Sequence, residues 1–187
     1  MNEITEKLSD LEIISLVKTG KTNVFSVLVK RHESKIAYTI FGILGNCQEA
    51  EDIGQEVFVR FFNSIDKFRG DAQLSTYLTR IAINLSLNEL KRRTRRKTFS
   101  YEDWHDSVKT EEDNVKSFMN YEMKEIVQKA LLQLEPKFRV VLVLRTLQGF
   151  STEETAEILK MPKGTVLSRL SRAQQKIKQI LEPYWEG

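Results

Sequence analysis

One stretch near the C-terminus determines how that part of the chain folds: GFSTEETAEILKMPKGT, residues 149–165. Ser151 and Glu154 have the spacing of a capping box, in which each side chain bonds the backbone amide of the other at the start of a helix. Pro162 and Gly164 follow within a few residues and break the chain again. The stretch therefore predicts a short helix, a tight turn and a second helix, which is the pattern of a helix-turn-helix.

Apolar residues predict how these helices pack. Ala156, Ile158 and Leu159 supply the inward face of the short helix, and a longer apolar helix is predicted before it over residues 136–147. On the helix after the turn, the apolar residues at helical spacing are Val166, Leu170, Ala173, Ile177 and Leu181. The opposite face carries Thr165, Ser168, Arg169, Arg172 and Lys176.

This polar, basic face indicates binding to duplex DNA. A helix of this kind enters the major groove with its N-terminal end first, where side chains near its start reach base edges and later cations meet phosphates. The alternative is a solvated face on an ordinary bundle helix. The capped short helix, the turn and the basic face occur together, and this combination favours DNA binding.

Composition sets outer limits on the class of protein. The chain has 187 residues, 41% apolar and 29% charged, enough for one domain or two small ones. No apolar run approaches the roughly 18 residues of a membrane span, so no membrane insertion of its own is expected. The N-terminus does not resemble a signal peptide, and a single cysteine excludes an internal disulfide. A cytoplasmic location is expected, while a net charge of +3 by itself says little about nucleic acid.

The distribution of charge predicts a domain boundary. Residues 91–97 hold six cations in seven positions, whereas residues 101–113 are strongly acidic. No helical or alternating pattern of apolar residues is evident between about residues 98 and 116, which is typical of a mobile tether. We therefore predict an all-α fold of two small helical domains, 8–97 and 119–183, joined by a flexible acidic linker at 98–118.

The first domain reads as a helical bundle with one acidic stripe. Helices are predicted over residues 10–19, 23–44 and 48–65, with a further one capped by Ser75. Glu49, Asp52 and Glu56 lie on one side of the third helix, where like charges repel one another. The stripe favours a basic partner surface, and the alternative is a simple solvated face.

The segment after this helix has the composition of a single-strand binding site. Phe68, Arg69 and Gly70 stand beside a helix that bears Tyr77, Arg80, Asn84 and Asn88 and runs into the six-cation cluster. Aromatic faces stack on bases, amides bond base edges and cations meet phosphates. The alternative is that Phe68 and Tyr77 belong to the core.

Several segments together match a known family: EAEDIGQEVF (49–58), FRGD (68–71), STYLTRIAIN (75–84), LEP (134–136), GFS (149–151) and GTV (164–166). In their order and spacing they resemble the extracytoplasmic-function sigma factors, the small two-domain subunits that start bacterial transcription. The resemblance covers nearly everything between residues 10 and 181. It implies a sigma region 2 domain, a sigma region 4 domain, core RNA polymerase and promoter DNA as partners, and an anti-sigma factor as regulator.

The resemblance also implies roles for individual residues. It implies that Asp52, Gln55 and Glu56 bind core RNA polymerase, by docking on the clamp helices of the largest polymerase subunit. Recognition and melting of the −10 element falls on Phe68, Arg69, Gly70, Tyr77, Arg80, Asn84, Arg92, Arg93, Arg95 and Arg96. Recognition of the −35 element falls on Lys163, Thr165, Ser168, Arg169, Ser171, Arg172 and Lys176. The chain departs from many members at Tyr77, Leu167 and Ser171, so its promoter sequence cannot be taken from theirs.

Catalysis, metal binding and cofactor binding are not expected. His32, His105 and Cys47 are isolated from one another in the sequence, which leaves no metal-ligand or nucleophile pattern. Two other functions stay open at this point. A free-standing helix-turn-helix regulator needs only the C-terminal domain, and an enzyme acting on nucleic acid requires metal coordination by Glu49, Asp52 and Glu56.

Overall fold

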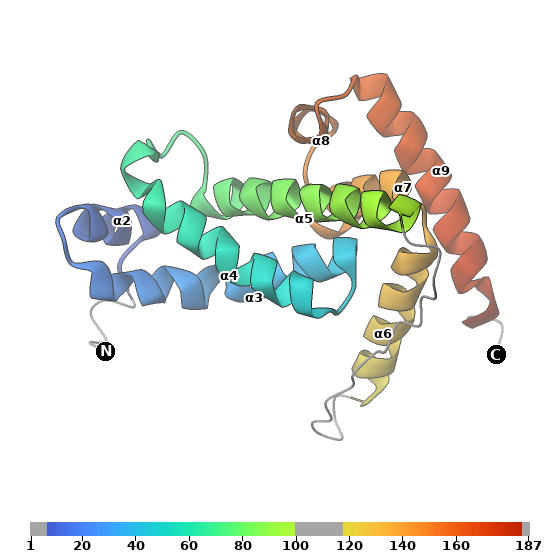
Figure 1. Cartoon of the computed structure of the whole chain (residues 1–187), viewed down its shortest axis with the longest axis horizontal. Helices are drawn as coiled ribbons and strands as arrows, with labels where there is room; N and C mark the ends of the chain where they lie inside the picture. Colours follow the sequence, from blue (N-terminus) through green and yellow to red (C-terminus); the bar gives the residue numbers. More distant parts are fainter. Residues whose placement is uncertain (1–6, 100–117, 185–187) are drawn as a thin grey trace. The chain divides into compact units, whose positions relative to one another are not determined.

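The computed structural model describes residues 7–99 and 118–184, and these residues form helices without a β-strand (Figure 1). The prediction of an all-α fold is confirmed. Most of the predicted linker, residues 98–118, lies outside the described residues. The first helices are α2 (Asp10–Lys18), η1 (Thr22–Val24), α3 (Phe25–Leu44), α4 (Gln48–Asn63), η2 (Ile65–Lys67) and α5 (Leu74–Phe99). The later helices are α6 (Phe118–Gln133), α7 (Pro136–Leu142), η3 (Val143–Leu147), α8 (Thr152–Leu159), α9 (Lys163–Leu181) and η4 (Glu182–Tyr184).

The chain divides into two compact units. The first unit contains residues 1–40 and 48–88, and the second contains residues 41–47 and 89–187, as far as these are described. Helices α3 and α5 therefore contribute to both units.

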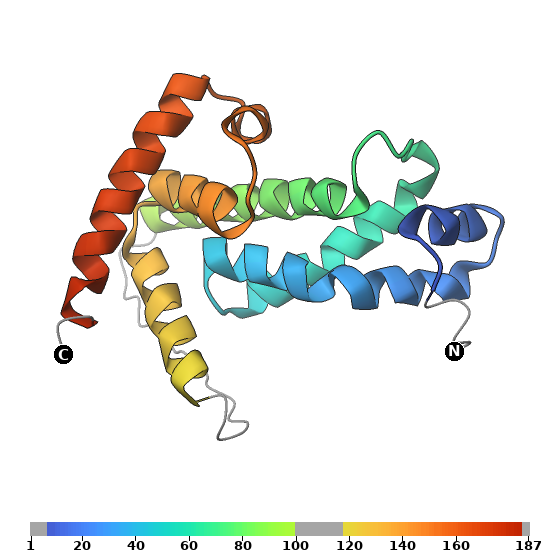
Figure 2. The same ribbon diagram turned by 180° about the vertical axis from the view of Figure 1, so that it is seen from behind.

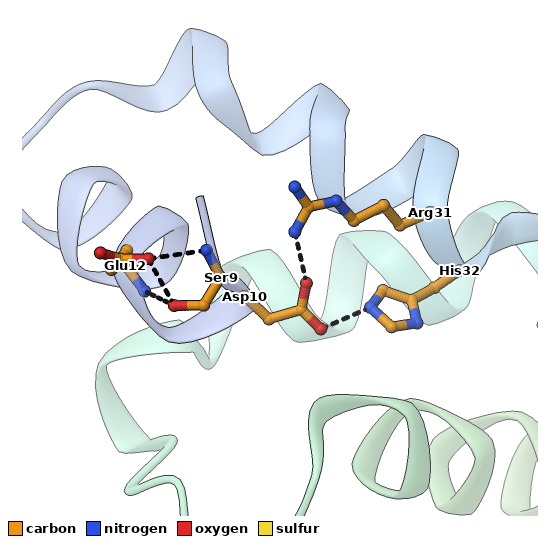
Figure 3. Close-up of polar contacts among 5 residues, drawn as sticks. All are labelled: Ser9, Asp10, Glu12, Arg31 and His32. Carbon is orange, nitrogen blue, oxygen red and sulfur yellow. Dashed lines mark hydrogen bonds and ion pairs between the residues drawn. The ribbon is translucent and has the colours of Figure 1, made fainter. Parts of the chain in front are cut away.

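In the first unit, α2 is tied to α3 by a carboxylate (Figure 3). Asp10 accepts from Arg31 Nη1 at 2.9 Å, and its other oxygen lies 2.8 Å from His32 Nε2. Ser9 and Glu12 form a capping box at the start of α2, which the sequence analysis did not identify. Hydrogen bonds from the Ser9 hydroxyl and then the Ser9 amide lower the pKa of Glu12. The end of α2 is thereby placed beside the loop before α5.

An aromatic cluster forms the centre of the first unit. Phe61, on α4, is fully buried. Its ring centroid lies 5.9 Å from that of Phe25 and 5.8 Å from those of Phe68 and Tyr77. Edge-on aromatic pairs at such distances are favourable beyond the area that they bury. The cluster therefore joins α3, α4, α5 and the loop between α4 and α5.

In the second unit, the apolar helix predicted over residues 136–147 is interrupted. It is an α-helix only to Leu142, and its last turn, η3, widens into a π-helix. The amide of Gln148 donates to Val143 O at 2.9 Å, five residues back, as in a π-turn. Arg145, within this turn, donates to the carbonyl oxygen of Phe150. The wider turn thus helps to shape the connection that leads into α8.

The helix-turn-helix is present, with two details that differ from expectation (Figure 2). The capping box is confirmed, since Glu154 N donates to Ser151 Oγ at 3.0 Å and Ser151 N donates to the Glu154 carboxylate at 2.8 Å. The helix buries Thr155 and Ile158, while Ala156 is only half-buried. Gly164 lies inside the first turn of α9, so it does not break the chain as predicted.

The residue that ends α8 is Lys160, which has a φ of 51° in the left-handed region. Glycine usually fills such a position, because an L side chain there is strained. Met161 N donates to Ala156 O at 3.0 Å and closes the turn. Pro162 then precedes α9 with a fixed φ of −59°. Lys160 and Pro162 together make the turn.

Replacing Ser151 with alanine is expected to lower the free energy of unfolding of the second unit by about 1 kcal/mol, because the amide of Glu154 loses its acceptor. Urea unfolding followed by circular dichroism measures the change. The matched control is Gln174→Ala on exposed α9, which is expected to shift stability by less than about 0.5 kcal/mol. Equal stability of Ser151→Ala and the original chain would contradict the capping role.

Candidate nucleic-acid and protein interfaces

The loop before α5 is fixed at its base. Lys18, at the end of α2, donates from Nζ to the carbonyl oxygens of Asp66 at 3.3 Å and Phe68 at 3.0 Å. Phe68 is only 6% exposed, and its ring packs edge-on against Tyr77 at 5.2 Å between centroids. Gly70 has a φ of 81°, which glycine adopts without strain. The sequence left open whether Phe68 is a stacking face or a core residue, and the structure places this ring in the aromatic cluster, where it supports the loop.

Polar residues around this base differ in exposure. Arg69 and Asp71 are exposed and form an ion pair with 3.7 Å between Nε and Oδ2. On α5, Tyr77 and Arg80 are half-buried, whereas Asn84 is exposed. These three residues of α5 recur at helical spacing and share one side of the helix. Arg69 and Asn84 are therefore the predicted contacts that present the most polar surface to solvent.

The six-cation cluster, residues 91–97, includes one arginine with a structural role. Arg92 Nε and Arg93 Nε lie 2.7 and 3.3 Å from the buried carboxylate of Glu89. Arg93 also donates to the carbonyl oxygen of Leu44 at 3.2 Å, where a cation stabilises the end of a helix. Sequence reasoning treated the arginines as equivalent because a charge run does not show which members meet backbone carbonyls.

Two arginines of the cluster are exposed, Arg92 and Arg95, and the side chain of Arg96 lies outside the described residues. Arg92 is exposed although it pairs with Glu89, whereas Arg93 is half-buried and has to leave both Glu89 and its carbonyl acceptor to reach a phosphate. All four stay predictions as phosphate contacts. The geometry favours Arg92 and Arg95 over Arg93.

One face of α4 is open to solvent and acidic. Asp52 and Gln55 are exposed, and Glu56 pairs with Arg60 at 2.6 Å while both side chains stay accessible. Val59 lies seven residues after Asp52 and therefore on the same side of the helix, and it is 51% exposed. Val59 was not predicted as a site residue. Its spacing from Asp52 and Glu56 places an apolar side chain on the polar stripe, and this signal was present in the sequence. We call Asp52, Gln55, Glu56 and Val59 the α4 face.

The first turns of α9 present the face expected of a reading helix. Its exposed residues are Lys163, Gly164, Leu167, Ser168, Ser171 and Arg172. Thr165 and Arg169 are half-buried at its border. The hydroxyl of Ser168 donates to Thr165 O at 3.1 Å, so in this rotamer its lone pairs are left to accept hydrogen bonds. Short side chains and one exposed arginine thus lie in the N-terminal turns of α9.

Two lysines of α9 are held by carboxylates. Lys163 Nζ lies 2.8 Å from Glu153 Oε1, and Lys176 Nζ lies 2.9 Å from Glu135 Oε1. The hydrogen bond from Lys163 lowers the pKa of Glu153. Hydrogen bonds from Lys137 and then Lys176 lower the pKa of Glu135 in the same way. These lysines reach a phosphate only by exchanging an internal partner for it.

The described residues contain no group of three or more histidine, cysteine or acidic side chains placed to hold a metal ion. Within the same residues, no helix has the length and hydropathy needed to cross a bilayer. What the fold does offer is a helix-turn-helix with a basic reading helix and a separate helical unit with a shaped loop. These features define a helical DNA-binding protein.

Comparisons with known proteins identify the family of DNA-binding proteins to which the chain belongs. Residues 28–96 match the family described as Sigma-70 region 2, and residues 124–177 match Sigma-70, region 4. The chain is 33% identical over 183 residues to the RNA polymerase sigma-H factor of Pseudomonas aeruginosa, covering 93% of this chain and 94% of that protein. It is 31% identical over 188 residues to the ECF RNA polymerase sigma-E factor of Escherichia coli K12, covering 96% and 98%.

Solved structures show the same fold. A sigma factor RpoE from Bartonella quintana, solved with the anti-sigma factor NepR, matches with a TM-score of 0.68 and 22% identity over 84% of this chain and 96% of that one. CnrH, solved with the cytosolic domain of CnrY, matches with a TM-score of 0.61 and 24% identity over 93% and 97%. At these identities the likeness concerns the fold alone.

The chain therefore belongs to the ECF sigma factors of the sigma-70 family. It is an RNA polymerase sigma factor that directs promoter-specific transcription. Sigma factors are non-catalytic initiation subunits, so the protein is not an enzyme. The family predicted from the sequence is confirmed, whereas the roles of individual residues stay predictions.

Proposed function

We propose that the two parts of this sigma factor divide promoter recognition between them, residues 8–97 acting on the −10 element and residues 119–183 on the −35 element. The matched family ranges, 28–96 and 124–177, support this division. The observation that carries the −35 assignment is the exposed face of α9, whose short side chains and Arg172 suit the major groove. A capped α8 and a fixed turn hold that face at the surface.

For the −10 element, the loop between η2 and α5 captures an unstacked base of one DNA strand. Arg69 and Asn84 offer hydrogen bonds, and Phe68 acts as a support that keeps the loop open rather than as a stacking partner. Unpairing and unstacking a base costs a few kcal/mol, which contacts in a prepared pocket offset. Arg92 and Arg95 then hold the phosphates beside it.

The α4 face binds core RNA polymerase. Its exposed carboxylates fit a basic surface, and Val59 supplies an apolar contact among them. Two solved structures of similar fold are complexes with a partner protein, and one of them is titled a sigma factor with an anti-sigma factor. We infer that a partner of this class regulates the present chain, and that the chain acts in the bacterial cytoplasm, where polymerase and promoter DNA are found.

A free-standing helix-turn-helix regulator explains less of the chain. Such a regulator has no need of the region that matches Sigma-70 region 2. It also leaves the exposed α4 face and the loop held by Lys18 without a role. No separate observation favours the regulator.

Two substitutions at exposed residues test the division of labour. With core polymerase bound, Asn84→Ala is expected to weaken promoter opening, measured by permanganate reactivity of unpaired thymines, while protection of the −35 duplex is kept. Arg172→Ala is expected to weaken −35 protection, and opening should recover on a template whose −10 region is already unpaired. Equal loss of both signals in both variants overturns the division.

Replacing Glu153 with glutamine is expected to strengthen binding to a −35 duplex about twofold to fivefold, because a repelling charge disappears and Lys163 is released to phosphate. The slope of log affinity against log salt should steepen by up to about 1. Filter binding at several salt concentrations measures both quantities. Glu182→Gln, beyond the end of α9, is the control. An unchanged affinity and slope in Glu153→Gln would show that Lys163 makes no phosphate contact.

A further inference from the structure

Leu167 stands out on the reading helix. It is 54% exposed, and it is the single large apolar side chain of α8 and α9 with such exposure among the described residues. A lone exposed leucine is common on protein surfaces and by itself indicates nothing. Its position is what matters, since it lies in the second turn of α9, on the face proposed to enter the −35 major groove.

Three exposed residues around Leu167 are short, and a fourth, Lys163 at a spacing of four residues, has a long side chain paired with Glu153. Gly164, Ser168 and Ser171 are its neighbours at spacings of three, one and four residues, and all are exposed. A Cβ atom placed on Gly164 would meet no other atom within 4 Å, so the space beside it is open. Leu167 therefore projects beyond Gly164, Ser168 and Ser171, and a groove that receives these residues also meets the leucine side chain.

The charge nearby indicates what covers the leucine. Arg172 is exposed five residues further along α9, and Lys163 is exposed four residues before Leu167. An apolar protein surface offers these cations no counter-charge, whereas DNA offers them phosphates. The major groove offers an apolar group of its own, the C5-methyl group of thymine, which distinguishes that base from the others.

Ser168 supports the same assignment. Its hydroxyl proton is directed to Thr165 O at 3.1 Å, so its lone pairs face outward as acceptors. In the major groove the matching donors are the amino groups of adenine and cytosine. A methyl group and an amino donor occur together in an A·T pair, where Leu167 and Ser168 find complementary groups.

We propose that Leu167 contacts the C5-methyl group of a thymine in the −35 duplex and is a specificity-determining residue of this sigma factor. The inference rests on the proposed −35 function and deepens it. Burying one methyl group in such a contact is expected to raise the affinity for DNA by roughly threefold to fivefold.

The test replaces thymine by uracil, which removes the methyl group and nothing else. A −35 duplex is first selected from a random library by the full chain bound to core polymerase. Each thymine on either strand is then changed singly to deoxyuridine, and affinities are measured at fixed salt. For the original chain, one position is expected to lose about threefold to fivefold in affinity. In Leu167→Ala, the same change should alter affinity by less than about 1.5-fold.

Gln175→Ala, exposed further along α9, is the matched control and should keep the full methyl dependence. Circular dichroism checks that each variant is folded. Three results overturn the inference: a selected site without thymine, no position sensitive to uracil, or an equal methyl dependence in Leu167→Ala. Failure of the complex to select any −35 duplex would overturn the proposed −35 function itself, and so the two failures are distinguishable.

Discussion

Replacing Phe61 with alanine is expected to lower the free energy of unfolding of the first unit by about 3–5 kcal/mol. Phe61 is fully buried, and its ring contacts those of Phe25, Phe68 and Tyr77. The substitution removes these contacts and leaves a cavity that the surrounding helices fill only in part. Because a whole domain is stable by about 5–15 kcal/mol, much of the stability is lost, together with the support beneath the loop.

The neighbouring Phe62 provides the control for this substitution. It is 37% exposed, and its ring meets that of Phe25 at 5.0 Å between centroids. Phe62→Ala is therefore expected to cost less than half as much as Phe61→Ala. Urea unfolding of the full chain, with tertiary structure followed by near-ultraviolet circular dichroism, compares the two. If both variants lose the same stability, the aromatic cluster is not the centre of this unit.

The second large effect is expected at the α4 face. Changing Asp52, Gln55 and Glu56 together to alanine should weaken binding to core RNA polymerase by about thirtyfold or more, equivalent to about 2 kcal/mol. The three side chains are accessible, so their loss removes contacts without opening a cavity in the helix. The loss should shrink at high salt, where the original complex is itself weakened. Fluorescence anisotropy with labelled protein measures the affinity.

The control for this triple variant removes the same amount of charge elsewhere. Glu33→Ala with Glu182→Ala deletes two exposed carboxylates outside α4, as the triple variant deletes two within it. This control is expected to change polymerase affinity by less than about threefold. A triple variant that binds polymerase as tightly as the original chain would refute docking through the α4 face.

Local sequence signals predicted much of this structure. Ser151 and Glu154 identified the start of α8 because a capping box depends on residues only three apart. The acidic side of α4 was predicted because helical spacing alone places Asp52 near Glu56. The family resemblance then followed from the order of such segments along the chain, and the comparisons confirmed it.

Features that depend on contacts distant in sequence were either left open, as the core position of Phe68 was, or not predicted. The burial of Phe68 results from Phe61 and Tyr77, and the loop carbonyls are held by Lys18 from another helix. The bond from Arg93 to a carbonyl at the end of α3 also cannot be read from a run of cations. The left-handed Lys160 was missed for another reason, because glycine or asparagine is the usual signal at that position.

The central claim is that this chain turns core polymerase into a promoter-specific enzyme complex through two DNA surfaces. The most direct measurement is transcription by purified bacterial core RNA polymerase, with and without the chain, on a fragment library of the source genome. We predict that the chain copurifies with polymerase and creates new start sites that share two elements at a fixed spacing. Absence of polymerase binding, with affinity for duplex DNA retained, would contradict the account.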